Sequence, residues 1–216
     1  MSQEQTEQVK FWQGDFGDAY VDRNSTSFNN LKMKLSMWAR IFDLMAGDMP
    51  KSILEVGPNI GLNIRAMKML CDGEYFAVEP NARAREVLIT ENVVPAENLQ
   101  DAFAGNFTLP EKPVDLAFTS GVLIHIHPDD LLAACRNIHK SSGKYIVCNE
   151  YFSDKPVAID YRGHDDKLFK RDFGAFWLDN FPDLKCLGYG FEWKRMTGHD
   201  NSTWWVFEKK QDLNHE

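Results

Sequence analysis

The stretch that most constrains the fold of this chain is residues 53–61. An apolar run surrounds Glu55 and ends at Gly57, a short loop follows, and a second glycine, Gly61, opens an amphipathic segment. This order predicts a strand, a tight loop and a helix. In α/β folds such a unit binds nucleosides, because the loop lets backbone N–H groups approach the ligand and the positive end of the helix faces it.

The loop departs from the glycine spacing typical of dinucleotide sites. Position 59 is Asn, and the residue three beyond Gly61 is Ile64, so the GxGxxG pattern is absent. Asn is the non-glycine residue that best tolerates a left-handed backbone, and Asn59 is therefore expected to make the turn. Glu55 stands just before this turn. Its carboxylate would repel the pyrophosphate of NAD and attract the ammonium and sulfonium of S-adenosylmethionine.

A second carboxylate, Glu79, follows the expected strand at residues 74–78 and comes eighteen positions after Gly61. An acid at this place can accept hydrogen bonds from two ribose hydroxyls, which both NAD and an adenosine cofactor carry. The alternative is a plain exposed glutamate at a strand end. Glu79 fits both cofactors, and the charge of Glu55 favours S-adenosylmethionine.

Composition narrows the class of protein. The 216 residues are 44% apolar and 26% charged, as expected for one globular domain, and the net charge of −8 argues against a nucleic-acid partner. No apolar run is long enough for a membrane span or a signal peptide, which predicts a cytoplasmic protein. The cysteines are too widely spaced for a disulfide framework or a zinc site: Cys71, Cys135, Cys148 and Cys186.

Strand-like and helix-like segments alternate beyond residue 50, which predicts a parallel sheet with helices on both faces. The expected strands are 52–56, 74–78, 99–102, 114–119 and 144–149, and the expected helices are 61–71, 82–91 and 129–141. An amphipathic helix at 29–46 and one or two short helical pieces within 4–22 come first. A polar loop at 150–170, a short helix at 172–180 and an antiparallel hairpin of 184–194 with 202–209 close the chain.

The pattern Glu-x-Gly-x-Asn-x-Gly, the acid after the second strand and the C-terminal hairpin resemble the class I S-adenosylmethionine-dependent methyltransferases over roughly residues 50–209. This resemblance implies an α/β fold with a single Rossmann-like seven-stranded sheet whose last strand is antiparallel. Two further segments, FWQGDFGDAY at 11–20 with Arg23 and Asn24, and YRGHDDKLFKRDFG at 161–174, are similar to the pseudaminic acid biosynthesis-associated methylases. We therefore expect a single methyltransferase domain, 1–216, with an N-terminal helical cap at 1–49, a cofactor-binding core at 50–209 and a substrate loop at 150–172.

By position, the resemblance assigns the contacts with S-adenosylmethionine to the following residues: Glu55, Gly57, Asn59, Gly61, Glu79, Asn81, Asn106, Ser120 and Gly121. Asn106 is the candidate at the adenine amino group, because Gly105 supplies no side chain there. Ser120 and Gly121 follow the fourth strand and are expected at the sulfonium end.

The acceptor side has candidates of two kinds. An alcohol acceptor needs a base, for which the candidates are His125, His164 and Glu150, whereas an amine must only be held unprotonated. Alternation puts His125 and His127 on one face, but without a third ligand they predict no metal, and His127 beside Pro128 is expected to start a helix. The cap and the loop supply candidate substrate contacts: Tyr20, Arg23, Tyr151, Tyr161, Arg162 and Lys167.

Arg162 and Lys167 are expected to hold a carboxylate or phosphate of the substrate, while Trp12 and Phe16 are expected only to pack. The sequence thus predicts methyl transfer from S-adenosylmethionine to an oxygen or nitrogen of a small polar metabolite, such as a sugar acid or another carboxylate-bearing compound, in small-molecule biosynthesis. The alternatives are an NAD-dependent oxidoreductase on the same fold and a non-catalytic, cofactor-binding scaffold protein.

Overall fold

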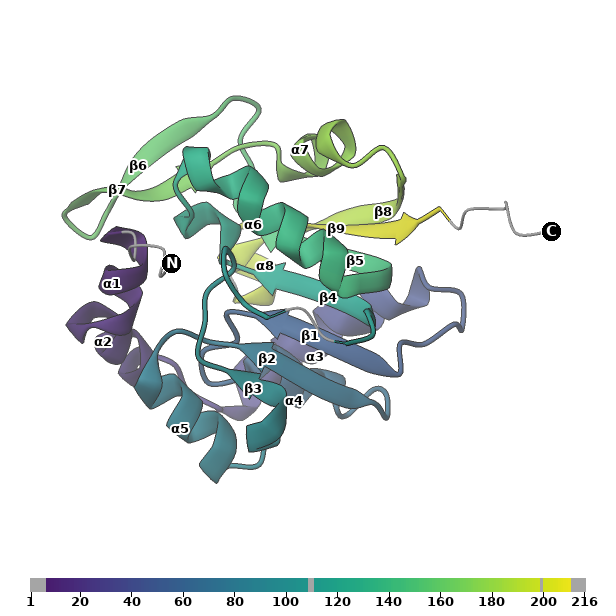
Figure 1. Ribbon diagram of the computed structural model, residues 1–216, viewed down its shortest axis with the longest axis horizontal. Helices are drawn as coiled ribbons and strands as arrows, with labels where there is room; N and C mark the ends of the chain where they lie inside the picture. Colours follow the sequence, from purple (N-terminus) through teal and green to yellow (C-terminus); the bar gives the residue numbers. More distant parts are fainter. Residues whose placement is uncertain (1–6, 109–110, 199, 211–216) are drawn as a thin grey trace.

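The computed structural model describes residues 7–108, 111–198 and 200–210. Residues 1–6 of the expected cap and position 199 of the expected C-terminal turn lie outside the described residues. Within the described part, seven strands form one sheet in the order β3-β2-β1-β4-β5-β9-β8 (Figure 1). Their bounds are β1 Ser52–Val56, β2 Glu74–Val78, β3 Leu99–Gln100, β4 Val114–Ser120, β5 Ser142–Glu150, β8 Leu184–Glu192 and β9 Ser202–Lys209.

The strand directions confirm the expected sheet. The pairs β2 with β3, β1 with β2, β1 with β4 and β4 with β5 are parallel, whereas β9 is antiparallel to both β5 and β8. Val56 lies opposite Val78, so the loop after β1 and the residues after β2 emerge side by side at one edge. This edge is where open α/β sheets place their ligands.

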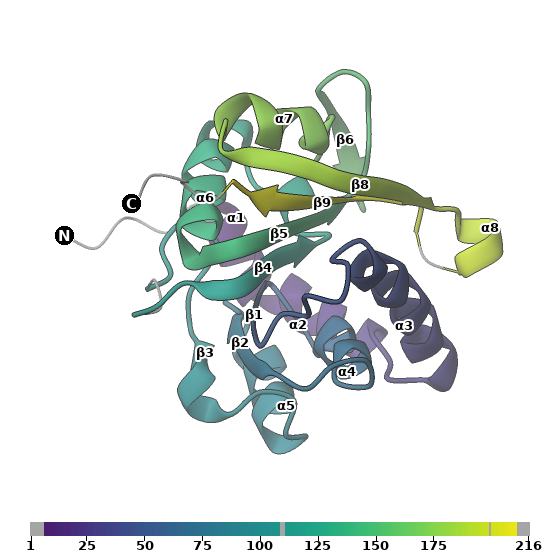
Figure 2. The same cartoon turned by 90° about the vertical axis from the view of Figure 1, so that its right-hand side faces the viewer.

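Helices cover both faces of the sheet (Figure 2). One face packs on α3 (Phe28–Asp43), α4 (Leu62–Met67) and α5 (Ala82–Thr90), and the other on α6 (Pro128–Ser141) and α7 (Phe173–Asn180). Because successive strand residues point to opposite faces, Ile146 and Cys148 join the cluster under α6 and α7, whereas Tyr145 and Val147 join the cluster under α3 and α4.

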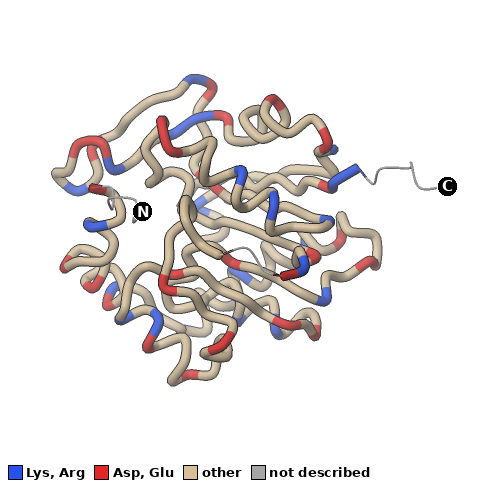
Figure 3. The backbone as a smooth tube through the Cα atoms, in the orientation of Figure 1, with Lys and Arg blue, Asp and Glu red and all other residues tan. Residues whose placement is uncertain are grey.

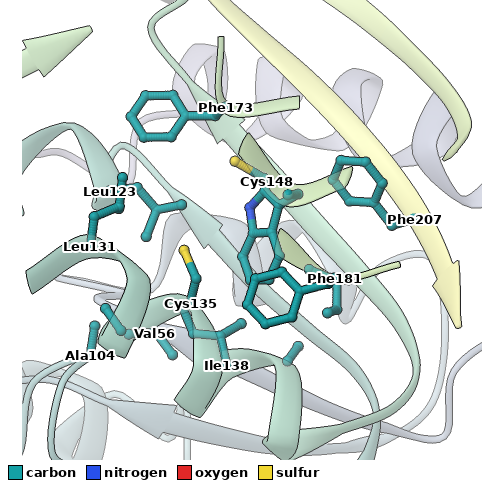
Figure 4. Packing of buried hydrophobic residues seen from close by; sticks show 14 of the residues in the cluster. Val56, Ala104, Leu123, Leu131, Cys135, Ile138, Cys148, Phe173, Phe181 and Phe207 are labelled. Carbon is teal, nitrogen blue, oxygen red and sulfur yellow. The ribbon is translucent and has the colours of Figure 1, made fainter. Parts of the chain in front are cut away.

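The cluster under α6 and α7 contains two of the cysteines. Cys135 and Cys148 lie among aromatic and aliphatic side chains there (Figure 4). Both thiols are free, as are those of Cys71 and Cys186. Burial raises the pKa of the Cys135 and Cys148 thiols well above the usual range, so both behave as small apolar side chains.

The N-terminal segment forms two short helices, as expected. These are α1 (Glu7–Gln13) and α2 (Asp15–Arg23), and they lie across the carboxyl ends of the strands beside the hairpin β6–β7 (Figure 1). Helix α3 then begins at the cap residue Ser27, whose hydroxyl accepts a hydrogen bond from the backbone N–H of Asn30.

Residues 150–170 are not the continuous loop that the sequence suggested. They contain an antiparallel hairpin of β6 (Val157–Tyr161) and β7 (His164–Lys170), in which Ile159 lies opposite Leu168. The turn is made by Arg162 and Gly163, both with positive φ. The prediction was wrong because β7 begins with four polar residues, 164–167, and so lacks the alternation of apolar and polar residues that marks a strand.

Other differences concern the ends of elements. Helix α4 ends at Met67 instead of residue 71, and β3 has two residues instead of four. The last four residues before the C-terminal turn form a short helix, α8 (Lys194–Thr197), that the sequence assigned partly to a strand. Two three-residue 3₁₀ turns, η1 (Ala96–Asn98) and η2 (Leu123–His125), also occur, and the second of them carries one of the candidate site residues.

Charged residues of both signs are interspersed over the tube drawn in Figure 3. None of the described helices combines the length and apolar character needed to cross a bilayer. The part of the chain that the structure describes also holds no cluster of three or more histidine, cysteine, aspartate or glutamate side chains suited to a metal ion.

Candidate active site

A cavity of about 700 Å³ lies at the carboxyl ends of β1, β2, β4 and β5, beneath the cap helices α1 and α2. Its walls come from segments far apart in the chain: the cap and the start of α3, the loops after the four strands, and the connection between β8 and β9. The two ends of the cavity differ in their chemistry, and we describe them in turn.

The loop after β1 forms one end. Gly57, Asn59 and Gly61 all have positive φ, of 75°, 51° and 76°, which confirms the left-handed turn expected at Asn59. A Cβ atom on Gly57 would stand 2.5 Å from a methyl carbon of Val122, so a side chain here would collide with the loop after β4. The two glycines therefore satisfy both a backbone conformation and a close approach.

Glu79 fastens this loop to the neighbouring strand. The carboxylate of Glu79 accepts hydrogen bonds from the backbone N–H of Asn59 at 2.8 Å and of Asn81 at 2.9 Å. Its side chain lines the cavity, is only 5% exposed, and has its pKa raised to about 7 by burial. The remaining lone pairs of the carboxylate are available to a ligand's hydroxyl groups.

Glu55 occupies a different position from the one expected. It is 1% exposed and does not belong to the cavity wall, which at this point is formed by Asn63 and Lys34. One carboxylate oxygen of Glu55 accepts a hydrogen bond from Asn63 Nδ2 at 2.7 Å, and the other oxygen has no hydrogen-bond partner among the described residues. Burial raises the pKa of Glu55 to about 7. Glu55 therefore supports the wall from behind instead of forming it.

Asn81 joins the residues after β2 to the cap. Its side-chain oxygen caps α5 by accepting from the backbone N–H of Ala84, and its Nδ2 donates to the carbonyl of Trp12 at 3.1 Å and to Asp18 at 2.8 Å. A second such link runs from Asn24 Nδ2 to Asn59 Oδ1 at 3.1 Å. Both Asn81 and Asn59 line the cavity, so residues of its wall also hold the cap in place.

Asn106, expected to contact the adenine, does not line the cavity. Asn106 is exposed, and its Oδ1 accepts a hydrogen bond from the backbone N–H of Phe103, so the side chain turns back onto its own loop. Phe103, Ala104 and Gly105 line the cavity instead. The sequence reasoning missed Phe103 because it searched this segment for a polar side chain.

The loop after β4 is held by Glu150, which is 0% exposed. Its carboxylate accepts hydrogen bonds from the backbone N–H groups of Val122, Leu123 and Ile124, and burial raises its pKa to about 7. Glu150 is not part of the cavity wall, so the structure does not support its role as a base. Its neighbour Asn149 is part of that wall and was missed.

Asn149 and Ser120 meet where β5 and β4 end. Asn149 Nδ2 donates to the hydroxyl of Ser120 at 2.9 Å, whereas Asn149 Oδ1 is buried without a hydrogen-bond partner among the described residues. Ser120 and Gly121 line the cavity as expected. A buried acceptor with no partner on a cavity wall is suited to a ligand's N–H or O–H group.

His125 lies on the wall at the end of η2, where its side chain is half-buried. Its Nδ1 is 2.6 Å from the carbonyl oxygen of Lys167. Because a carbonyl only accepts, Nδ1 carries the proton and Nε2 keeps the lone pair. The ring packs edge-on against Trp12, with centroids 4.7 Å apart, and burial lowers its pKa to about 4, so it is neutral at physiological pH.

Further polar groups complete this end. Tyr20 and Tyr151 line the cavity as expected, and the Tyr151 hydroxyl donates to Asp200 at 2.8 Å. Burial raises the pKa of the Tyr20 hydroxyl. His127 caps α6, as the sequence predicted, and also lines the cavity. The sequence reasoning missed several wall residues here, and no local pattern marks them: Asn24, Asn30, Lys34, Asp200 and Ser202.

The other expected substrate residues are not on the wall. The Arg23 guanidinium lies 5.3 Å from the ring centres of Phe16 and Tyr20. At the exposed tip of the β6–β7 hairpin, Arg162 lies over the Tyr161 ring. His164 is exposed and packs against Phe11, whose ring also lies 5.6 Å from the Lys167 ammonium.

These side chains connect the cap to the hairpin, and Lys167 serves the site through its backbone. Tyr161 contacts the His125 ring, at a centroid distance of 5.0 Å, without lining the cavity. Trp12, expected only to pack, lines the cavity. We therefore correct the assignment of Arg23, Tyr161, Arg162, Lys167 and His164: the structure does not bring their side chains into the site.

Comparison with known proteins agrees with this geometry. Residues 54–147 match a family model described as a methyltransferase domain. No curated protein matches the chain at a significant level. Many solved structures do share its fold.

Three of these structures span nearly the whole chain. Magnesium protoporphyrin IX methyltransferase from Synechocystis, with bound S-adenosylmethionine, is 9% identical, with 97% of this chain and 100% of that chain covered and a TM-score of 0.66. The 1,6-didemethyltoxoflavin-N1-methyltransferase of Burkholderia thailandensis, with S-adenosylhomocysteine, is 13% identical, with 98% and 94% covered and a TM-score of 0.67. The plantazolicin methyltransferase, with S-adenosylhomocysteine, is 12% identical, with 94% of each chain covered and a TM-score of 0.66. At these identities the likeness shows a common fold.

Proposed function

We propose that this S-adenosylmethionine-dependent methyltransferase transfers the cofactor's methyl group to a nitrogen or oxygen of a small polar acceptor. The observation that supports the proposal is the single cavity whose one end is the β1 loop with Glu79 and whose other end is a wall of amide, hydroxyl and imidazole groups. Its volume of about 700 Å³ is in the range of small-molecule sites, which are roughly 300–1,000 Å³. The Burkholderia neighbour, by its name, methylates a small heterocycle.

The residues at the donor end fit a nucleoside. Glu79, fixed by two backbone N–H groups, is placed to accept hydrogen bonds from ribose hydroxyls. Phe103, Val78 and Ala104 supply apolar surface for a purine. Because Gly57 has no Cβ, the loop after β1 can lie close to Val122 in the loop after β4. These residues would hold the adenosine part of the cofactor.

When bound, the cofactor supplies a methyl group on a cationic sulfur, which an in-line displacement passes to a lone pair of the acceptor. The chain's share of the work is to align the acceptor and to keep water out. Trp12 and Tyr20 of the cap cover the cavity and contribute to this exclusion. Asn149 Oδ1, still without a partner among the described residues, would accept a hydrogen bond from the acceptor's N–H or O–H and so orient its lone pair.

His125 is the residue we assign to proton removal. It is the only one of the three candidate bases named above that lies on the cavity wall. Its Nδ1–H is held by the Lys167 carbonyl, so Nε2 is the atom that accepts a proton from a hydroxyl acceptor, and its low pKa keeps Nε2 unprotonated at neutral pH. An amine acceptor would need only this neutral imidazole as a hydrogen-bond partner.

The test has two stages. Isothermal titration calorimetry with S-adenosylhomocysteine should give saturable binding, and a Glu79→Ala variant should bind at least about 10-fold more weakly, because the ribose loses a charged hydrogen-bond partner. The protein is then incubated with S-adenosylmethionine carrying a deuterated methyl group and a small-molecule extract, and mass spectrometry should identify a compound that gains the label only with the wild-type protein.

The finer resemblance in residues 11–24 and 161–174 makes sugar acids the first pure acceptors to add. Absence of S-adenosylhomocysteine binding would contradict the cofactor assignment. Binding without labelled product from any extract would contradict the transfer reaction and would favour a cofactor-binding protein without catalysis.

A further inference from the structure

Lys34 occupies a distinctive position in the cavity. It lies on α3 and lines the wall together with Asn30, Met33 and Asn63. Among the described residues that line the cavity it is the one lysine or arginine. The cations that the sequence suggested for this role, Arg162 and Lys167, point elsewhere. Among the described wall residues, Lys34 is therefore the one lysine or arginine that could pair with a carboxylate entering the cavity.

The acidic groups near Lys34 are engaged with other partners. Four carboxylates favour its charged form, Glu55 most strongly and then Glu192, Asp200 and Glu150, while burial opposes it and lowers its pKa. Glu55 accepts from Asn63, and Glu150 accepts from three backbone N–H groups. The other two carboxylates, Glu192 and Asp200, also have hydrogen-bond partners.

Glu192 is bound by Arg40 at 2.5 Å and by the Trp204 indole N–H at 3.0 Å. Asp200 accepts from the Tyr151 hydroxyl and from the Lys194 ammonium. In the described part of the chain, no hydrogen bond or ion pair joins the Lys34 ammonium to any of the four. Lys34 is half-buried on the cavity wall. A partly desolvated ammonium whose N–H donors are unused is unfavourable, and a ligand that brings anionic oxygens reduces this penalty.

We propose that Lys34 is the carboxylate-binding residue of this cavity. The inference rests on the proposed function, because the ligand that always brings a carboxylate is the methyl donor, through its amino-acid end. Glu55 and Asn63, which lie beside the first glycine loop, are the neighbours that tie Lys34 to the donor end. Glu55 then acts as a positioning residue: its charge helps to keep the lysine protonated. The other possible source of a carboxylate is an acidic acceptor.

The experiment compares three probes on four proteins by isothermal titration calorimetry. S-adenosylhomocysteine has the full amino-acid end, its decarboxylated analogue keeps only the amine, and 5′-methylthioadenosine has neither group. The proteins are the wild type, Lys34→Met, Lys34→Arg, and the control Lys32→Met, which removes the same charge from an exposed position of the same helix. Thermal unfolding verifies that each variant is folded.

Lys34→Met should lower the affinity for S-adenosylhomocysteine by about 10- to 100-fold, as expected for a lost hydrogen bond between charged groups. The affinities for the decarboxylated analogue and for 5′-methylthioadenosine should change by less than about 3-fold. Lys32→Met should leave the affinity for all three probes unchanged. Lys34→Arg should recover part of the loss. In two buffers of different ionisation enthalpy, the proton uptake on binding S-adenosylhomocysteine should be smaller in Lys34→Met, since the carboxylate raises the pKa of the wild-type lysine.

Equal weakening of all three probes by Lys34→Met would overturn the proposal, because the lysine would then act only through the fold. If S-adenosylhomocysteine is unaffected, acetate is titrated into the protein already loaded with it. Acetate binding that Lys34→Met abolishes would support a carboxylate site for the acceptor, and no such binding would overturn the proposal. Failure of the wild type to bind any adenosine probe would instead contradict the proposed function itself.

Discussion

The two ends of the cavity are built in different ways. The donor end is made by residues 57–60, 62–63 and 78–81, at the ends of two adjacent parallel strands; Gly61 shapes the loop without lining the cavity. The backbone there is fixed by hydrogen bonds between the two loops, such as that from Asn59 N–H to Glu79. The acceptor end collects side chains from segments around residues 12–24, 120–127, 149–151 and 200–202. The shape of the donor end depends mainly on backbone conformation, whereas the acceptor end depends on side chains that come from distant parts of the chain.

Because the two ends are built differently, substitutions at each end should affect different steps, cofactor binding at one and methyl transfer at the other. A backbone change at the donor end should abolish cofactor binding, whereas a side-chain change at the acceptor end should slow transfer and leave binding intact. The cap links the two ends, because Asn81 and Asn59 line the donor end and also form hydrogen bonds with cap residues. The following predictions test how far the two ends are separable.

The largest effect is expected from Gly57→Ala. Its φ of 75° is unfavourable for a residue with a Cβ by about 1–2 kcal/mol, and the added carbon would stand 2.5 Å from Val122. We expect S-adenosylhomocysteine affinity to fall by more than about 100-fold in calorimetry, since the loop must move.

The matched control for this substitution is Gly163→Ala. Gly163 also has a positive φ, of 81°, but its added Cβ would meet nothing within 4 Å, and it lies in the β6–β7 turn. It should lower the free energy of unfolding by about 1 kcal/mol without changing affinity. Wild-type affinity in Gly57→Ala would show that the loop is not the donor site.

The next largest effect should appear in His125→Leu, which keeps the ring's approximate bulk and removes the proton acceptor. With a hydroxyl acceptor, methyl transfer should slow by about 100-fold, while S-adenosylhomocysteine affinity stays within about 3-fold. Labelled product per enzyme and calorimetry measure the two quantities. His164→Gln is the control, since this exposed histidine should affect neither. A parallel loss of affinity in His125→Leu would mean that the two ends are not separable.

A moderate effect is expected from pH. Glu79, with a pKa of about 7 in the free protein, accepts hydroxyl hydrogen bonds with both oxygens only when ionised. Affinity for S-adenosylhomocysteine should therefore rise about 10-fold from pH 6 to pH 8. Glu79→Gln should bind more weakly and remove this rise. An unchanged pH profile in Glu79→Gln would assign the titration to another group.

The same raised pKa values act on stability with the opposite sign. Glu55, Glu79 and Glu150 all have pKa values of about 7 when folded, against 4.5 as their ordinary value. Between these values the folded chain binds more protons than the unfolded chain, so stability without ligand should fall as pH rises from about 4.5 to 7. Chemical denaturation at several pH values measures this, and Glu150→Gln should reduce the slope without affecting cofactor binding.

The smallest effect is expected from Arg162→Asn. This arginine lies at the exposed tip of the hairpin with a φ of 57°, which asparagine tolerates. Transfer and cofactor affinity should each change by less than about 2-fold in the same two assays. A decrease in the methyl-transfer rate of more than about 10-fold would indicate that the hairpin binds substrate. It would also argue against Lys34 as the cation that pairs with a carboxylate in the cavity.

The donor end and most of the sheet could be predicted because their signals are local. The strands at 52–56 and 74–78 have the expected bounds, and the turn at Asn59 follows from the conformational tolerance of one residue type. The C-terminal hairpin was equally readable from two apolar runs and a turn. Such features are determined by neighbours within a few residues of the chain.

The rest of the cavity wall could not be predicted for the opposite reason. Lys34 stands in an ordinary amphipathic helix, and nothing in its spacing reveals that its side chain reaches the cavity. Asp200 and Ser202 lie on the wall only because β9 inserts beside β5. Conversely, the rich polar content of residues 161–167 suggested a substrate loop, but these side chains join the cap to the hairpin. Polarity alone does not distinguish a ligand contact from a contact between surface elements.

The position of β9 also bears on how the chain reaches this structure during synthesis. It is the last of the described strands in chain order, yet it occupies an interior place in the sheet, between β5 and β8. Until residues 202–209 have left the ribosome, β8 has no described strand to pair with and the apolar edge of β5 is uncovered. Completion of the sheet, and with it of the wall that carries Asp200 and Ser202, must therefore wait until residues 202–209 have been synthesised.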